Sequence, residues 1–339
     1  MVASTMTDKF RIGVAGLSHG HVGGLIGNLE REDSVQLVAV AEAQDIAPQL
    51  KAKFDRQYHD YQTMIKDEQL DGLLVTSNNK ESAQIAIEAL NAGIPTMVEK
   101  PMAANGADAD RMRAAWRASG KPLLINWQFV WDPWLADLGT RVNEGEIGQV
   151  FHLKCRNGHF GPKEIGCESY FVDWLYNEEL NGGGAIADFG GYGALLATWL
   201  LGMPETVYAI RGNQTKEYEI SDDHAMILMR YPKATAVIEA TWATVNFGAY
   251  PVASVFGDKG TLTEERQQVR KITRDTDEII IPDTLAPANA AQGFLQAIET
   301  GITPPGLLHP DLNADACHII DAAIRSDRSG RAEIPAASL

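Results

Sequence analysis

The feature that most constrains this chain is the alternation of apolar runs with amphipathic segments between residues 10 and 126. Apolar runs typical of buried strands cover residues 10–16, 35–41, 70–77, 94–99 and 122–126. Segments with helical spacing of apolar side chains lie between them, at 22–29, 45–54, 81–92 and 108–119. Strands that alternate with helices at this spacing form parallel βαβ units, so we predict a doubly wound α/β domain over residues 8–125.

A glycine-containing turn, G-L-S-H-G-H over residues 16–21, joins the first predicted strand to the first helix. Backbone amides in such a turn, together with the N-terminus of the helix, bind the pyrophosphate of a dinucleotide. The G-x-G-x-x-G pattern is incomplete, because Ser18 and His21 hold the second and third glycine positions. A tight turn without a ligand is the alternative. We predict a Rossmann-type cofactor site that includes Gly16, Ser18, His19, Gly20 and His21.

An acidic residue, Glu42, follows the second predicted strand, about 20 residues beyond the glycine turn. An acid at this position accepts hydrogen bonds from ribose hydroxyls and repels a 2′-phosphate. No arginine follows it, so we predict NAD rather than NADP as cofactor; a solvated loop acid is the alternative. Ser77 and Asn78, at the end of the third strand, complete this part of the predicted site.

The next apolar strand closes with Glu99-Lys100-Pro101. Ligands of doubly wound sheets bind at the carboxyl ends of the strands. Lys100 is therefore predicted to lie where a reacting group would lie, and Glu99 and Lys100 are predicted to line the cofactor site.

From Trp127 onward, strand patterns follow one another without intervening helices. They cover residues 149–156, 205–211, 224–231, 235–242, 252–256 and 260–263, while helices are predicted at 131–143, 189–201, 288–300 and 311–326. Consecutive strands of this kind pair antiparallel. We predict a second, α+β domain over residues 126–339 that is built on a large, mostly antiparallel open sheet and binds the substrate. Arg156, on the first of these strands, faces solvent, a second subunit or a substrate. His159, in the loop after that strand, is either a pocket residue or a surface histidine.

The second chemical stretch is N-G-G-G-A-I-A-D-F-G-G-Y, over residues 181–192. Asp188 lies where a helix N-cap would lie, so a purely structural role as N-cap is the alternative to a chemical one. Tyr192 follows four residues later and so shares its helix face. Each glycine in a helix costs about 1 kcal/mol, so their density indicates a backbone that closely approaches a ligand or another strand.

Composition excludes several classes of function. The formal net charge of −16 argues against nucleic acid or an anionic membrane as partner. The N-terminus has no signal-peptide pattern and no stretch reaches about 18 apolar residues. The three cysteines are far apart, which is typical of reduced thiols in a cytoplasmic protein. The eight histidines show no metal-binding spacing, so we predict no metal.

Taken in order, these motifs resemble the glucose–fructose oxidoreductase and inositol dehydrogenase family, from about residue 9 to residue 335. The resemblance rests on the first strand and turn, Glu99-Lys100-Pro101, and the glycine-rich stretch leading to Asp188, with further marks at 145–148 and 256–261. It implies a nicotinamide cofactor, a sugar, cyclitol or related polyol as substrate, and a homodimer or homotetramer formed through the second sheet. It also implies a cis peptide bond before Pro101.

The resemblance further implies that Lys100 and Asp188 act at the reacting carbon. The chain departs from the family at two positions: Tyr192 replaces a histidine, and Val130 replaces an arginine on the substrate side. Candidate substrate contacts are Trp127, Gln128, Arg156 and His159.

A cation within about 4–6 Å lowers the pKa of a tyrosine. We therefore expect Lys100 to tune Tyr192 into a base, with Asp188 orienting the substrate hydroxyl or Lys100. Two other functions stay open: a glycoside-cleaving or epimerising enzyme that oxidises transiently, and a non-catalytic NAD-binding regulator.

Overall fold

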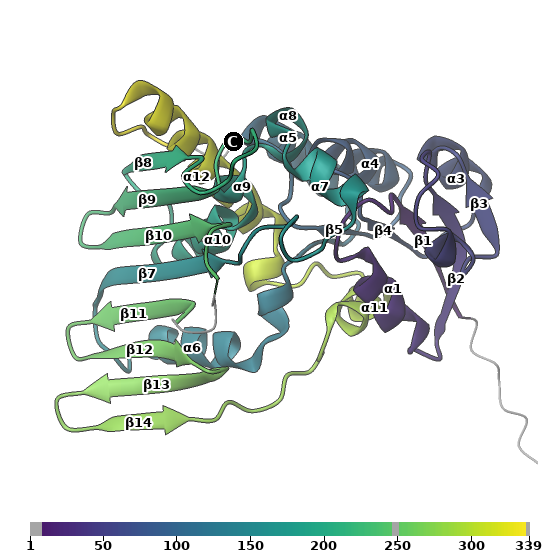
Figure 1. The fold of residues 1–339 in the computed structure, drawn as a ribbon. Coiled ribbons are helices and arrows are strands. Elements are labelled where there is room, and N and C mark those ends of the chain that lie inside the picture. The colour runs from purple at the N-terminus through teal and green to yellow at the C-terminus, as the bar shows by residue number, and fades with distance from the viewer. Residues whose placement is uncertain (1–8, 246–250, 337–339) are drawn as a thin grey trace, which may run out of the picture.

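The computed structural model describes residues 9–245 and 251–336, and it contains two sheets (Figure 1). The first sheet has six strands, in the order β3-β2-β1-β4-β5-β6, and all of its pairs are parallel. These strands are β1 (Phe10–Ala15), β2 (Val35–Ala41), β3 (Arg56–Tyr58), β4 (Gly72–Val75), β5 (Thr96–Glu99) and β6 (Leu123–Asn126). This confirms the predicted doubly wound sheet. The strand order reverses between β1 and β4, which is where such sheets bind ligands.

Five helices follow the strands of this sheet: α1 (Val22–Glu30), α2 (Pro48–Lys51), α3 (Tyr61–Asp67), α4 (Asn79–Asn91) and α5 (Gly106–Ser119). The apolar face expected on α1 is buried, at Val22, Leu25, Ile26 and Leu29. The helix predicted over 45–54 is wrong in length, because α2 begins only at Pro48 and has no buried residue. A late helix, α11 (Ala290–Thr300), packs beside α1 and contributes Phe294 to the same core (Figure 1).

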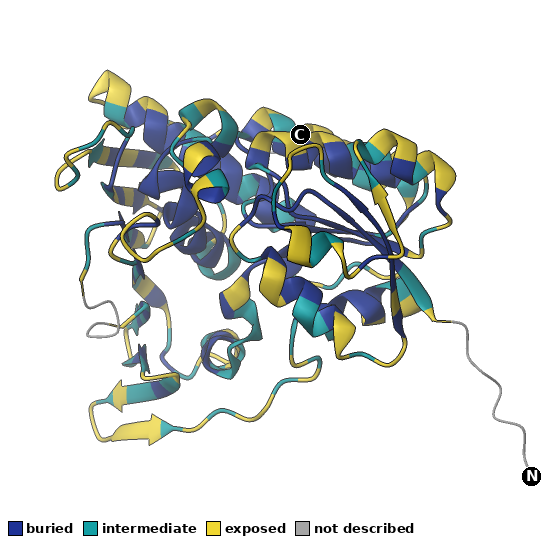
Figure 2. Ribbon diagram, turned by 45° about the vertical axis from the view of Figure 1, so that its right-hand side comes forward, coloured by how far each residue is buried: buried dark blue, intermediate teal, exposed yellow. Residues whose placement is uncertain are grey.

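The second sheet has eight strands, in the order β14-β13-β12-β11-β7-β10-β9-β8. They are β7 (Val150–Gly158), β8 (Thr206–Gly212), β9 (His224–Arg230), β10 (Thr235–Thr241), β11 (Ala253–Gly257), β12 (Gly260–Glu265), β13 (Gln268–Thr273) and β14 (Asp277–Ile280). Only β7 and β10 pair in parallel, so the sheet is mostly antiparallel, as predicted. The hairpin of β13 and β14 was not predicted, and its outer strand is largely exposed (Figure 2).

Helices cover one face of this sheet and leave the other open (Figure 1). The covering helices are α6 (Pro133–Asn143), α10 (Gly190–Leu201) and α12 (Pro310–Ser329). The first sheet is connected to the second through the short helix η1 (Gln128–Trp131) and α6. Four more short helices are α7 (Ser169–Leu175), α8 (Glu178–Asn181) and α9 (Ala185–Asp188), which follow β7, and η3 (Gly306–Leu308), which follows α11.

Among the described residues, no single helix is long and apolar enough to cross a membrane. One bent pair of helices, Glu178–Asp188 with Gly190–Leu201, has the length and composition of a membrane span, and nothing else supports that assignment. The apolar residues of its second helix, α10, lie in the core under the second sheet.

Candidate active site

The centre of the site is an ion pair between Lys100 and Asp188, which are 88 residues apart in the chain. Lys100 directly follows β5, and its backbone N–H donates to the carbonyl of Asn126 at 3.1 Å. Asp188 ends α9. The Lys100–Pro101 peptide bond is cis, as the resemblance implied. Both charged side chains are buried, with exposed fractions of only 4% and 8%, so each depends on the other for compensation of its charge.

The two groups hold each other in their charged forms. Burial would raise the pKa of Asp188, but the charges of Lys100 and His159 and the bonds from Lys100 and Trp242 lower it below its usual value. Burial would lower the pKa of Lys100, but the charge of Asp188 raises it above its usual value. The Nε1 of Trp242 donates to the second carboxylate oxygen at 3.0 Å. The N-cap interpretation of Asp188 is wrong, because Phe189 is the N-cap of α10.

Tyr192 lies beside this pair, in an aromatic environment. Its ring meets the rings of Trp127 and Phe129 edge-on, at centroid distances of 4.7 and 4.9 Å, and the Nζ of Lys100 lies 5.2 Å from its centroid. Burial raises the pKa of Tyr192 to about 12, although the charge of Lys100 acts to lower it. The charge of Lys100 lowers the pKa of Tyr192 as expected, but burial outweighs it, so the net shift is opposite to the one expected for a base. The phenol stays protonated at neutral pH.

The glycine-rich turn makes room for neighbouring backbone. A Cβ on Gly182 would lie 2.1 Å from the carbonyl oxygen of Ala104, just beyond the Glu99-Lys100-Pro101 segment. A Cβ on Gly184 would lie 2.2 Å from the carbonyl oxygen of Asp222. The close approach inferred from glycine density is confirmed, and at these two positions the approaching group is protein backbone.

Asp222 anchors the start of α9, a role that the sequence did not indicate. It is fully buried, and its carboxylate accepts the backbone N–H groups of Gly184 at 3.0 Å and Ile186 at 2.7 Å. Arg211 pairs with the same carboxylate at 3.1 Å. This arrangement fixes the short helix that carries Asp188.

Three of the predicted nucleotide residues line a cavity of about 410 Å³ at the ends of β1, β2 and β4. The carboxylate of Glu42 accepts the backbone N–H groups of Leu17 and Gln44, each at 2.8 Å. Gly16 has φ +81°, and a Cβ there would lie 2.7 Å from the backbone of Ser77, so only glycine fits. The structure thus brings Gly16, Glu42 and Ser77 together.

The remaining predicted cofactor residues are not among those that line this cavity. Asn78 caps α4 by accepting the N–H of Glu81 at 3.0 Å. Ser18 is buried, and its carbonyl accepts the Nε1 of Trp174 at 3.1 Å. Gly20 packs against the ring of Phe171.

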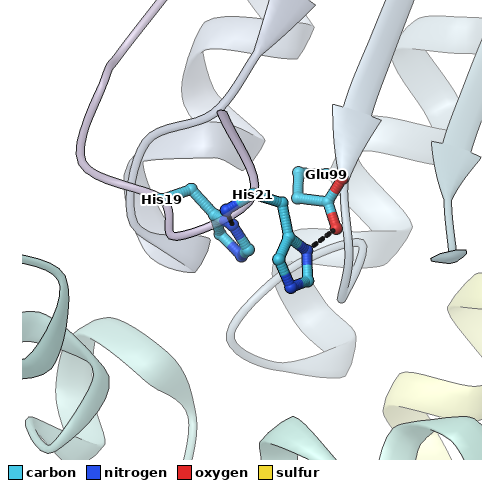
Figure 3. Close-up of side chains that lie close together, drawn as sticks. All are labelled: His19, His21 and Glu99. Carbon is cyan, nitrogen blue, oxygen red and sulfur yellow. Dashed lines mark hydrogen bonds and ion pairs between the residues drawn. The ribbon is translucent and has the colours of Figure 1, made fainter. Parts of the chain in front are cut away.

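Figure 3 shows a cluster of His19, His21 and Glu99 between the β1–α1 turn and the end of β5. His21 Nδ1 lies 2.8 Å from a carboxylate oxygen of Glu99, and the backbone N–H of His21 donates to His19 Nδ1 at 3.2 Å. Burial lowers the pKa of His19 well below its usual value. The nitrogen and oxygen atoms of the three side chains lie within 4.8 Å of one another, and the two Nδ1 atoms are engaged in the hydrogen bonds just described. The spacing of these residues in the sequence did not indicate this hydrogen-bonded cluster.

The candidate substrate residues separate into two groups. His159 lies at the site: its ring meets Phe189 edge-on at 4.9 Å, and burial lowers its pKa while the charge of Asp188 opposes this. Trp127 is buried behind Tyr192, and Gln128 is exposed on η1. Arg156 is not brought to the site, because it lies on the open face of the sheet and pairs there with Glu239 at 2.9 Å.

Two family models match the chain. The model described as "Oxidoreductase family, NAD-binding Rossmann fold" matches residues 10–127, and the GFO/IDH/MocA C-terminal domain matches residues 136–263. Among curated relatives, inositol 2-dehydrogenase of Salmonella typhimurium is 23% identical over 322 residues, which cover 88% of this chain and 89% of the relative. D-xylose 1-dehydrogenase (NADP(+)) 2 of Haloferax volcanii is 23% identical and covers 81% of this chain and 83% of the relative.

Solved structures share the whole fold. An oxidoreductase from Agrobacterium radiobacter, in complex with NAD+, L-tartaric acid and magnesium, superposes with a TM-score of 0.80 at 17% identity. The match covers 98% of this chain and all of that one.

Proposed function

The chain belongs to the GFO/IDH/MocA family of oxidoreductases, and we propose that it is an NAD-dependent dehydrogenase acting on a secondary hydroxyl of a sugar, cyclitol or related polyol. The observation that carries this proposal is the buried ion pair of Lys100 with Asp188 at the carboxyl end of β5. A protein that only bound NAD would not need a buried lysine and aspartate held in their charged forms. Relatives named as inositol and xylose dehydrogenases support the substrate class.

The residues at the β1–α1 turn fit a dinucleotide. Gly16 lets the backbone come close to Ser77, and Glu42 stands at the end of β2 with its carboxylate fixed by two backbone amides. A fixed carboxylate at this position favours ribose hydroxyls over a 2′-phosphate, which supports NAD over NADP. Bound nicotinamide would supply the hydride acceptor.

The chain's own groups would handle the substrate oxygen. The ammonium of Lys100 donates a hydrogen bond to the reacting hydroxyl and stabilises the negative charge that develops on it. Asp188 keeps that ammonium charged and in place. Tyr192, with its proton retained, borders the reacting group, and His159 faces it from the end of β7.

The open face of the second sheet supports a homodimer or homotetramer. Large apolar side chains are exposed there, including Ile210 at 56% and Leu228 at 48%. Exposed apolar patches of this kind mark interaction surfaces.

The three cysteines, free in the described chain, support a reducing compartment such as the cytoplasm.

The test is a fluorescence screen for NADH formation across cyclitols, aldoses, anhydrosugars and uronates, with NAD and NADP in parallel. We expect stoichiometric NADH from at least one compound, with NAD preferred. Lys100→Ala should abolish turnover and leave the Kd for NADH within a few-fold, whereas the exposed-pair control Lys53→Ala should leave both unchanged. Loss of NADH affinity in Lys100→Ala would assign Lys100 to the cofactor site alone.

A further inference from the structure

We propose that His21, held by Glu99, is the base that takes the proton of the substrate hydroxyl. The proposal rests on the dehydrogenase function above and assigns the proton acceptor that this function needs. His21 occupies the third glycine position of the nucleotide turn, where it was predicted only as a cofactor contact.

A chain of hydrogen bonds fixes the carboxylate that holds His21. One oxygen of Glu99 lies 2.8 Å from His21 Nδ1, and the other accepts the Nδ2 of Asn126 at 2.6 Å. Asn126 in turn accepts the Nε1 of Trp131 at 2.8 Å. Because both oxygens are engaged and Glu99 is buried, the carboxylate can neither rotate away nor bind water freely.

This carboxylate selects the tautomer of His21. A carboxylate beside Nδ1 favours the form with the proton on Nδ1, which leaves the lone pair on Nε2. Figure 3 shows Nε2 pointing away from both Glu99 and the turn. The His21 side chain keeps 26% of its surface exposed, against 1% for Glu99, and Nε2 has no partner among the described residues. The free nitrogen is therefore the accessible end of the dyad.

The neighbouring groups are poorly suited to accept a proton. Tyr192 keeps its own, with its pKa raised to about 12. The pKa of Lys100 is raised by Asp188, and both oxygens of Asp188 accept hydrogen bonds. His19 lies against His21 at a centroid distance of 4.8 Å, but its Nδ1 already accepts the backbone N–H of His21. An imidazole oriented by a carboxylate is a common general base in enzymes.

The step balances without another reactant. The C–H bond of the carbinol carbon would break, and its electron pair would leave as hydride to a bound nicotinamide. The O–H bond breaks and its proton moves to His21 Nε2, directly or through one bridging hydroxyl, as the C=O bond forms. The carboxylate of Glu99 stabilises the imidazolium until the proton passes to solvent.

The test compares His21→Asn with His152→Asn, a control on the open face of the second sheet that bonds Thr235. Asparagine can still donate to Glu99 but cannot accept the proton at the position of Nε2. With a compound that the wild type oxidises, we expect kcat of His21→Asn to fall about 10²–10⁴-fold. The Kd for NADH should stay within a few-fold. Added imidazole should restore part of the kcat of His21→Ala, with saturation.

Three results would overturn the proposal: a kcat within a few-fold of wild type in His21→Asn, NADH affinity falling in parallel with kcat, or a loss of kcat in His159→Asn but not in His21→Asn. Each leaves the dehydrogenase function in place. By contrast, a wild type that forms no NADH with any compound of the screen refutes the function itself.

Discussion

The ion pair of Lys100 and Asp188 allows the energetics of the site to be tested without a substrate. Asp188→Asn removes the negative charge and keeps an oxygen for the Nε1 of Trp242. It leaves the Lys100 ammonium buried without an anion. Breaking a buried pair from one side costs about 3–5 kcal/mol. A chain of 339 residues unfolds with an entropy of about 0.7 kcal/mol/K, so this cost lowers Tm by roughly 4–7 °C.

A double-mutant cycle separates the charge interaction from other damage. Lys100→Met alone leaves Asp188 as an unpaired buried anion and should be destabilising by a similar amount. The double variant Lys100→Met/Asp188→Asn has no buried charge, so we expect it to be more stable than either single variant. Thermal unfolding at neutral pH measures the stability of the wild type, the two single variants and the double variant. Lys53→Met, which breaks an exposed ion pair, is the control and should change the stability by at most about 1 kcal/mol.

The pH dependence of this stabilisation follows from the two pKa shifts. The pKa of Asp188 is lowered in the folded state, so its contribution is present above its unfolded value and is lost as pH falls through the folded one. The pKa of Lys100 is raised, so its contribution is present below its unfolded value and is lost only as pH rises through the folded one. The stability gap between wild type and single variants should therefore be flat around neutral pH and shrink in acid. Additive losses in the double variant, or a gap that grows in acid, would refute the reasoning.

Three further predictions test the nucleotide site, the glycine-rich turn and the open sheet. Glu42→Ala should raise the KM for NAD by about 10–100-fold through lost charge-assisted bonds, and should improve kcat/KM for NADP relative to NAD; an unchanged ratio would exclude Glu42 from the site. Gly184→Ala should destabilise the protein by about 1–3 kcal/mol or more because its Cβ meets the backbone of Asp222, whereas Gly23→Ala on α1, with open space around it, should stabilise by up to about 1 kcal/mol in thermal unfolding. Leu228→Asp should convert an oligomer to monomer in sedimentation velocity, and a wild type that is monomeric at micromolar concentration would contradict the assembly.

The parts of the fold that were predictable are those whose burial leaves a periodic pattern. The first sheet follows from apolar runs buried on both faces, and α1 from four apolar residues at helical spacing. The hairpin β13–β14 was missed because its strands bury little: β14 has no buried residue, and β13 buries only Val269. The three-residue strand β3 has no apolar pattern for the same reason.

Site residues that belong to a recognisable motif were predictable from the sequence. Properties that depend on packing between distant parts of the chain were not. The resemblance implied that Lys100 and Asp188 both act at the reacting carbon, and holding Lys100 was one of the two roles expected for Asp188. The direction of the Tyr192 shift depends on burial among Trp127 and Phe129, which lie more than 60 residues earlier in the chain. The contact of His21 with Glu99 spans 78 residues and leaves no local pattern at either position.

Two contacts away from the ion pair hold the turn that carries Asp188. Gly182 lies against the carbonyl of Ala104, and the side-chain amide of Asn79 on α4 donates to Asn181 at 2.7 Å. The first contact joins the segment after β5 to the turn that carries Asp188, and the second joins α4 to the same turn. Such a cradle suits a charge that must stay fixed while a substrate oxygen gains and loses its proton. The proton itself requires a group with an accessible end, and in this cluster the 26% exposure of the His21 side chain provides one.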